Sequence, residues 1–178
     1  STKSFRDQGH WDKILGTLRP GDFVFIQFGH NDQKESDPKR YSDPETFGSN
    51  LKRYIEETRA KGAVPVLLTS IARRKFDAKG KPAQTLRRYT SVTRQVAEQT
   101  ATPLIDMDAK TRALLEEMGP EASKSIYLWA QKSDYPNLKT DKKDDTHLNP
   151  DGAERYASMV VDGIREQQIE PLIENLKK

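Results

Sequence analysis

Two short polar clusters carry the residue types and spacing that could do chemistry. Gly29-His30-Asn31-Asp32 directly follows an apolar run, and Asp144 lies three residues before His147. A carboxylate at that spacing can fold back and accept the imidazole Nδ1–H, which fixes the tautomer and leaves Nε2 as a base. Only three histidines occur in the chain, and two of them fall in these clusters. The pattern favours a site for general acid–base catalysis.

Each cluster also has a purely structural interpretation. Gly-x-Asn-Asp is common turn chemistry, and Asp144 and Asp145 could simply neutralise Lys142 and Lys143 on a surface loop. The third histidine, His10, stands beside Trp11 and is expected to pack. It is the presence of both clusters that favours function.

The elements that would position these clusters alternate along the chain. Residues 22–28, 64–70 and 103–106 are short apolar runs typical of buried parallel strands. Helical spacing recurs over 43–62, around 89–96 and around 113–115, and a last helix is expected from about 149 to 164. This order predicts an α/β domain whose ligands bind at the carboxyl ends of the strands, where Gly29 to Asp32 would lie.

Composition narrows the class of protein. The 178 residues hold 30 Lys and Arg against 27 Asp and Glu, a net charge of +3, with both signs interleaved, which argues against a nucleic-acid binder. Cysteine is absent, which excludes disulfides, thiol nucleophiles and cysteine-bound zinc. The apolar runs are far shorter than the roughly 20 residues that cross a bilayer, so we expect no membrane span. We treat 1–178 as a single domain.

Two irregular stretches could contact a ligand. One, residues 72–88, contains Arg73, Arg74, Arg87 and Arg88, whose guanidinium groups could bind carboxylates, although a solvated loop explains them as well. The other, residues 119–143, contains Trp129 and Tyr135, which could stack on sugar rings or anchor the loop.

The two clusters resemble the SGNH, or GDSL-type, hydrolases. That superfamily carries Gly-x-Asn-Asp at the end of its third strand and Asp-x-x-His before its last helix. Three segments look like the rhamnogalacturonan acetylesterase group within that superfamily. They are Ser1-Thr2-Lys3-Ser4-Phe5, the run from Phe25 to Lys34, and Asp145-Thr146-His147-Leu148-Asn149. The resemblance implies a three-layer α/β/α, flavodoxin-like fold with a parallel sheet.

The resemblance also implies roles for individual residues. His147 would be the general base, Asp144 would orient it, and the Asn31 amide would donate to the oxyanion of the tetrahedral intermediate. Gly29, His30 and Asp32 would shape the substrate pocket. Separately from the resemblance, the guanidinium groups of Arg73 and Arg74 are candidates to bind substrate carboxylates. No metal or organic cofactor is implied.

The chain departs from the family in one respect. The family's nucleophile is the serine of an N-terminal Gly-Asp-Ser block, and no Gly-Asp-Ser occurs in this sequence. We therefore expect the first strands of the domain and the nucleophilic serine to lie upstream of Ser1, leaving the 22–28 strand with an unpaired edge.

The leading expectation is a serine esterase that removes acetyl groups from a pectic polysaccharide, exported or periplasmic, with an acetylated polysaccharide or oligosaccharide as its partner. One alternative is a metal-dependent hydrolase using His30, Asp32, Asp144 and His147 as ligands. Another is a carbohydrate-binding relative without catalysis. The sequence does not indicate an oligomeric state.

Overall fold

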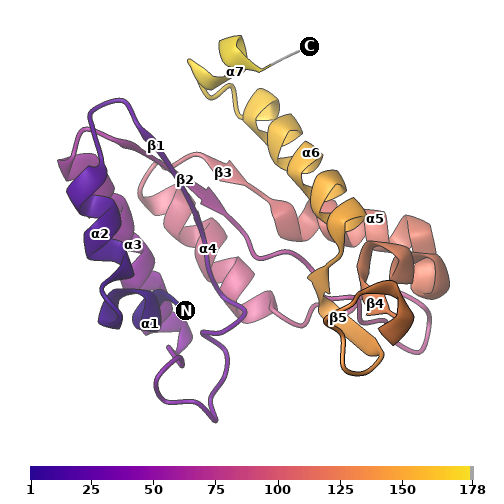
Figure 1. Ribbon diagram of the computed structural model, residues 1–178. Helices are drawn as coiled ribbons and strands as arrows, with labels where there is room; N and C mark the ends of the chain where they lie inside the picture. The colour runs from indigo at the N-terminus through magenta and orange to yellow at the C-terminus, as the bar shows by residue number, and fades with distance from the viewer. Residues whose placement is uncertain (177–178) are drawn as a thin grey trace. The chain divides into compact units, whose positions relative to one another are not determined.

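The computed structural model describes residues 1–176, apart from the side chain of Asp134. The chain folds into two compact units (Figure 1). The first contains Ser1–Ser70, Leu86–Asp106 and Gln167–Ile169; the second contains Ile71–Thr85, Met107–Glu166 and the residues from Glu170 on. That residues 1–178 form a single domain stays a prediction.

A three-stranded sheet forms the centre of the first unit. The strands β1 (Phe23–Gln27), β2 (Val64–Leu68) and β3 (Leu104–Ile105) lie in the order β1-β2-β3, and both pairings are parallel. Phe25 is opposite Val66, and Leu68 is opposite Ile105. The predicted parallel α/β architecture is confirmed, and the carboxyl ends of the strands share one edge of the sheet.

Four helices accompany this sheet: α1 (Thr2–Asp7), α2 (His10–Thr17), α3 (Pro44–Ala60) and α4 (Arg87–Gln99). The predicted start of α3 is confirmed, because the Asp43 carboxylate accepts the N–H groups of Glu45 and Thr46 and Pro44 is the first helical residue. That cap satisfies backbone donors that have no partner within the helix.

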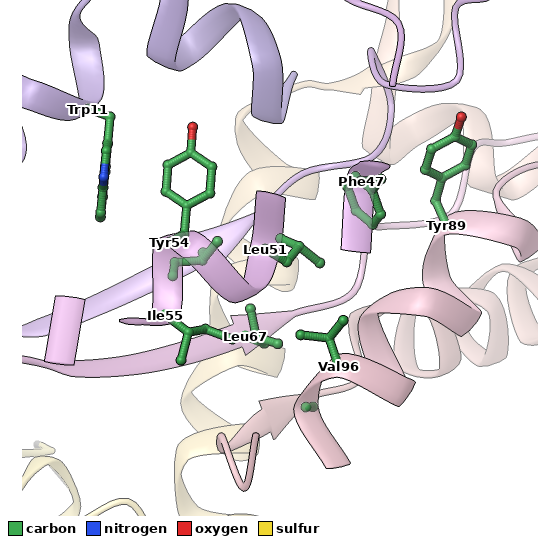
Figure 2. Close-up of a cluster of buried hydrophobic side chains, with 10 residues drawn as sticks. Trp11, Phe47, Leu51, Tyr54, Ile55, Leu67, Tyr89 and Val96 are labelled. Atoms are coloured by element: carbon green, nitrogen blue, oxygen red, sulfur yellow. The ribbon is translucent and has the colours of Figure 1, made fainter. Parts of the chain in front are cut away.

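The core of the first unit lies between the sheet and these helices. Leu51 and Ile55 of α3, Leu67 of β2 and Val96 of α4 gather there (Figure 2). Trp11, Tyr54, Phe47 and Tyr89 complete the labelled cluster, and the rings of Trp11 and Tyr54 meet edge to face at 4.7 Å. The apolar stripes predicted for the helices are therefore core positions.

Strand β1 has one covered face and one free edge. Ile26 is buried in the core, whereas the side chain of Phe25, which points to the opposite face, is 40% exposed. The expectation of a buried strand therefore holds for one face of β1 only, and the unpaired edge expected for residues 22–28 is present in the structure described. Within residues 1–176, β1 pairs only with β2, so its other edge carries no ladder partner.

The second unit is built from helices and a β-hairpin. The helices are α5 (Met107–Ala122), η1 (Ser123–Ile126), η2 (Lys132–Asp134), α6 (Pro150–Glu166) and α7 (Leu172–Asn175). Strands β4 (Tyr127–Ala130) and β5 (Lys142–Leu148) pair antiparallel, with Trp129 opposite Lys143. The prediction of an irregular stretch over 119–143 is therefore only partly right. Across the described residues, no helix is both long enough and apolar enough to span a membrane.

Candidate active site

Gly29 ends the segment that leaves β1. Its φ of 134° lies in a region that side-chain-bearing residues rarely adopt, and a Cβ there would collide with the Ser70 hydroxyl. That hydroxyl donates to the Phe28 carbonyl at 2.7 Å. The segments that follow β1 and β2 therefore approach each other closely, and this approach requires glycine at position 29. The contact fixes the position of the chain from which residues 30–32 continue.

Asp32 holds the loop from inside. The residue is fully buried, and its Oδ1 accepts the Thr2 backbone N–H at 2.8 Å and the Thr2 hydroxyl at 2.5 Å. Its Oδ2 accepts the Gly29 N–H at 3.1 Å, and its carbonyl accepts the Ser42 N–H at 3.0 Å. Because both carboxylate oxygens are used inside the protein, Asp32 positions the loop. Asp32 also lines the pocket at the end of β1, so its expected part in shaping that pocket stays a prediction.

Asn31 and His30 line a shallow pocket of about 110 Å³ at the carboxyl end of β1. Both residues are half-buried. Within the part of the chain that the structure describes, the Asn31 side-chain amide donates no hydrogen bond, so its N–H groups are available to a ligand in this pocket. That is the requirement for a donor to a developing oxyanion.

Asp144 and His147 form the predicted pair in the second unit. Asp144 Oδ2 is 2.7 Å from His147 Nδ1, and Asp144 Oδ1 accepts the backbone N–H groups of Thr146 at 2.8 Å and His147 at 3.0 Å. The hydrogen bond assigns the proton of a neutral imidazole to Nδ1. The His147 side chain is 74% exposed, which leaves Nε2 open to a reacting group.

The same contacts lower the pKa of the Asp144 carboxyl group. Burial alone raises the pKa of this carboxyl group, but the hydrogen bonds from the His147 backbone, the His147 ring and Thr146 together hold the pKa below its ordinary value of 3.8. Asp144 is therefore ionised when His147 acts as a base, and its charge supports the imidazolium that forms.

A second cluster fixes β5 next to this pair. Asp145 Oδ1 accepts Arg74 Nε–H at 2.7 Å and Trp129 Nε1–H at 2.8 Å, and the Arg74 guanidinium lies 4.7 Å from the centroid of the indole ring. Arg74 also donates to the Pro120 carbonyl at 2.7 Å and is only 9% exposed. Contrary to the prediction of a substrate contact, Arg74 is an internal anchor. Trp129 serves as its partner, with the Lys124 ammonium also 4.8 Å from the ring.

The residues after His147 seat helix α6. Asn149 Oδ1 accepts the Gly152 N–H at 2.9 Å, and Asn149 Nδ2 donates to the Ser125 carbonyl at 2.7 Å. A Cβ at Gly152 would collide with the Ile126 carbonyl. The sequence predicted only a helix start here, and the Gly at the fourth position of Asn-Pro-Asp-Gly is the signal that indicates close packing.

The remaining predicted residues differ in accessibility. Arg73 is half-buried, and burial lowers the pKa of its guanidinium. Arg87 and Arg88 are exposed at the start of α4. Arg88 lies 3.9 Å from Glu35, a distance typical of a weak surface pair. The binding roles of these residues stay predictions.

The metal-site alternative gains no support. No group of three or more His, Asp or Glu side chains placed to hold a metal ion occurs among residues 1–176. Asp32, one of the four suggested ligands, already spends both oxygens on Thr2 and Gly29. Asn31 lies in the first unit and the Asp144–His147 pair in the second.

The chain belongs to the GDSL-like lipase/acylhydrolase family, whose model matches residues 1–155. It is thus a hydrolase of the serine ester hydrolase class, as the resemblance implied. It is 40% identical over 166 residues to the rhamnogalacturonan acetylesterase RhgT of Bacillus subtilis (strain 168), covering 93% of this chain and 70% of that protein. It is 34% identical over 179 residues to the probable rhamnogalacturonan acetylesterase YesY of the same organism, covering 100% and 77%.

Solved structures agree on the fold. The crystal structure of the YxiM protein of Bacillus subtilis matches with a TM-score of 0.78 and 28% identity; the match covers 95% of this chain and 44% of that one. The acetylxylan esterase Axe2 of Geobacillus stearothermophilus matches with a TM-score of 0.64 and 20% identity, covering 96% and 70%. The SGNH-hydrolase fold predicted from the two clusters is confirmed.

Proposed function

We propose that this protein is a carbohydrate acetylesterase that removes acetyl groups from a pectic saccharide. The observation that carries the proposal is the Asp144–His147 pair, whose Nδ1–Oδ2 hydrogen bond of 2.7 Å leaves Nε2 exposed in a member of an acylhydrolase family. The acetyl and pectic parts are supported by the relatives that are named rhamnogalacturonan acetylesterases.

In the proposed reaction, His147 Nε2 takes the proton from a serine hydroxyl as its oxygen attacks the acetyl carbonyl carbon. The oxyanion of the tetrahedral intermediate accepts a hydrogen bond from the Asn31 amide. As the C–O bond to the sugar breaks, His147 returns the proton to the departing hydroxyl and leaves an acetylated serine. Water then attacks by the same route and releases acetate.

The nucleophile is not assigned to a residue. In the family it is the serine of a Gly-Asp-Ser block, which does not occur within residues 1–178. Labelling the protein with a fluorophosphonate, followed by peptide mass spectrometry, identifies the nucleophilic serine directly. We also propose that the protein works outside the cytoplasm, where polymeric pectin is found; cell fractionation tests this.

The test of the function is acetate release from acetylated pectic oligosaccharides by that same protein. We expect His147→Ala to lower kcat by several orders of magnitude, because the members of a catalytic triad act as a unit. His10→Ala is the matched control and should leave the rate within a few fold. Activity of His147→Ala near that of the parent would overturn the assignment of the base. Saccharide binding with no acetate release by the parent would favour a non-catalytic relative.

A further inference from the structure

The segment between β2 and α4 concentrates positive charge. Residues 71–85, which we call the basic loop, contain five Lys and Arg residues and a single acidic residue, Asp77. In a chain whose total charge is only +3, this is a strong local excess. The loop belongs to the second unit and runs beside the β4–β5 hairpin (Figure 1).

The basic loop is held in shape by its own backbone. Phe76 and Pro82 form a β-bridge, and the Ala83 N–H donates to the Lys75 carbonyl at 2.7 Å. The Asp77 carboxylate accepts the backbone N–H groups of Lys79 at 2.8 Å and Lys81 at 2.9 Å. The one acidic side chain of the loop is thus spent on closing its turn.

The lysine ammonium groups of the loop face solvent. Lys75 and Lys79 are exposed, and neither lies within 4.0 Å of a carboxylate in the residues described. Lys81 Nζ is 3.7 Å from Glu116, but both side chains are at least 60% exposed. Such a pair contributes little and exchanges readily for another anion. The three ammonium groups are therefore available to an anionic ligand.

The basic loop is also tied to the acid–base pair. Next to Lys75, the Arg74 backbone N–H donates to the Asp145 carbonyl at 2.8 Å, while its guanidinium holds the Asp145 carboxylate. Asp145 directly follows Asp144, the partner of His147. Neighbouring Cα atoms are about 3.8 Å apart. Because Lys75 follows Arg74 directly, its backbone lies only a few residues' distance from the Asp144–His147 pair.

We propose that the basic loop is a substrate subsite in which Lys75, Lys79 and Lys81 bind the carboxylates of uronate residues next to the acetylated sugar. This inference rests on the proposed function, since it places the subsite beside the base of that reaction. It selects between the substrates named for the relatives, because a neutral xylan backbone offers no carboxylate and a uronate-rich backbone offers many.

A binding experiment tests the subsite without catalysis. De-esterified oligogalacturonate is titrated into the protein by calorimetry, with a neutral xylo-oligosaccharide of the same length in parallel. We expect the Lys75→Gln, Lys79→Gln, Lys81→Gln triple variant to bind oligogalacturonate about tenfold more weakly, since each exposed pair accounts for a factor of roughly two to five. Raising the salt concentration should weaken parental binding in the same direction.

A matched control separates local from global charge. The Lys13→Gln, Lys52→Gln, Lys61→Gln variant removes the same charge from the first unit and should bind like the parent. Equal weakening in both triple variants, equal binding of the xylo-oligosaccharide, or equally tight binding of polyglutamate would each overturn the proposed subsite. In the acetate-release assay, the triple variant of the basic loop should show a raised KM for acidic substrates and an unchanged KM for neutral ones, which supports the subsite. Failure of the proposed function would instead appear as no release from any acetylated saccharide.

Discussion

The buried carboxylate of Asp32 offers a direct measure of what holds the loop that carries Asn31. It accepts three hydrogen bonds, two from Thr2 and one from Gly29. In Asp32→Asn, one carboxylate oxygen becomes an amide N–H₂ that faces a donor. The variant loses a charge-assisted bond worth about 1.5–3 kcal/mol and leaves a buried N–H without an acceptor at a further cost of about 1–3 kcal/mol.

We therefore expect Asp32→Asn to lower the free energy of unfolding by about 3 kcal/mol, measured by urea denaturation followed by circular dichroism. With a denaturant slope of about 1–3 kcal/mol/M, the midpoint should fall by roughly 1–3 M. Asp7→Asn, at an exposed site on α1, is the control and should stay within about 0.5 kcal/mol of the parent. An unchanged midpoint and slope for Asp32→Asn would refute the view that this carboxylate clamps the loop.

Three further outcomes follow from the site. Asn31→Ala should lower kcat by about 10²–10³ with little change in the urea midpoint, because the amide stabilises only the oxyanion; equal losses in kcat and stability would contradict this. Gly152→Ala should destabilise the protein by about 2 kcal/mol or more in thermal unfolding, since the new Cβ meets the Ile126 carbonyl; a stabilised variant would show that helix α6 is not seated there. The lowered pKa of Asp144 means that its ionised form stabilises the fold above the ordinary value of 3.8, and that this stability is lost as the pH falls through the lower, folded pKa. The NMR signal of the His147 Nδ1 proton should accordingly persist down to pH 3.8, and its loss well above that pH would show that the carboxyl group is not held ionised.

The two units provide different kinds of group to the proposed reaction. The first provides an amide donor on a loop fixed by buried hydrogen bonds, and the second provides a base whose partner is held by backbone N–H groups. Proton transfer tolerates an exposed ring, whereas an oxyanion donor must be held still before the charge develops. The deep burial of Asp32 and the exposure of His147 agree with that difference.

Local patterns in the sequence predicted much of the structure. The strands at 22–28 and 64–70, the capped start of α3 and the Asp144–His147 hydrogen bond depend on short-range chemistry: β-branched runs, an Asp-Pro cap and a carboxylate three residues from an imidazole. Spacing alone is enough for such features, because the interacting atoms belong to neighbouring residues.

Contacts between distant residues decided the rest. Arg74 was predicted to bind substrate from its charge, but it meets Asp145, Trp129 and the Pro120 carbonyl, partners that lie 46 to 71 residues away in the chain. Asp32 likewise became a buried clamp because Thr2, 30 residues earlier, places two donors on its carboxylate. The sequence by itself determined which chemical groups the protein has and the local turns that hold them. Only the tertiary structure decided which charges are consumed inside and which remain for a ligand, because burial and pairing depend on partners that no local pattern specifies.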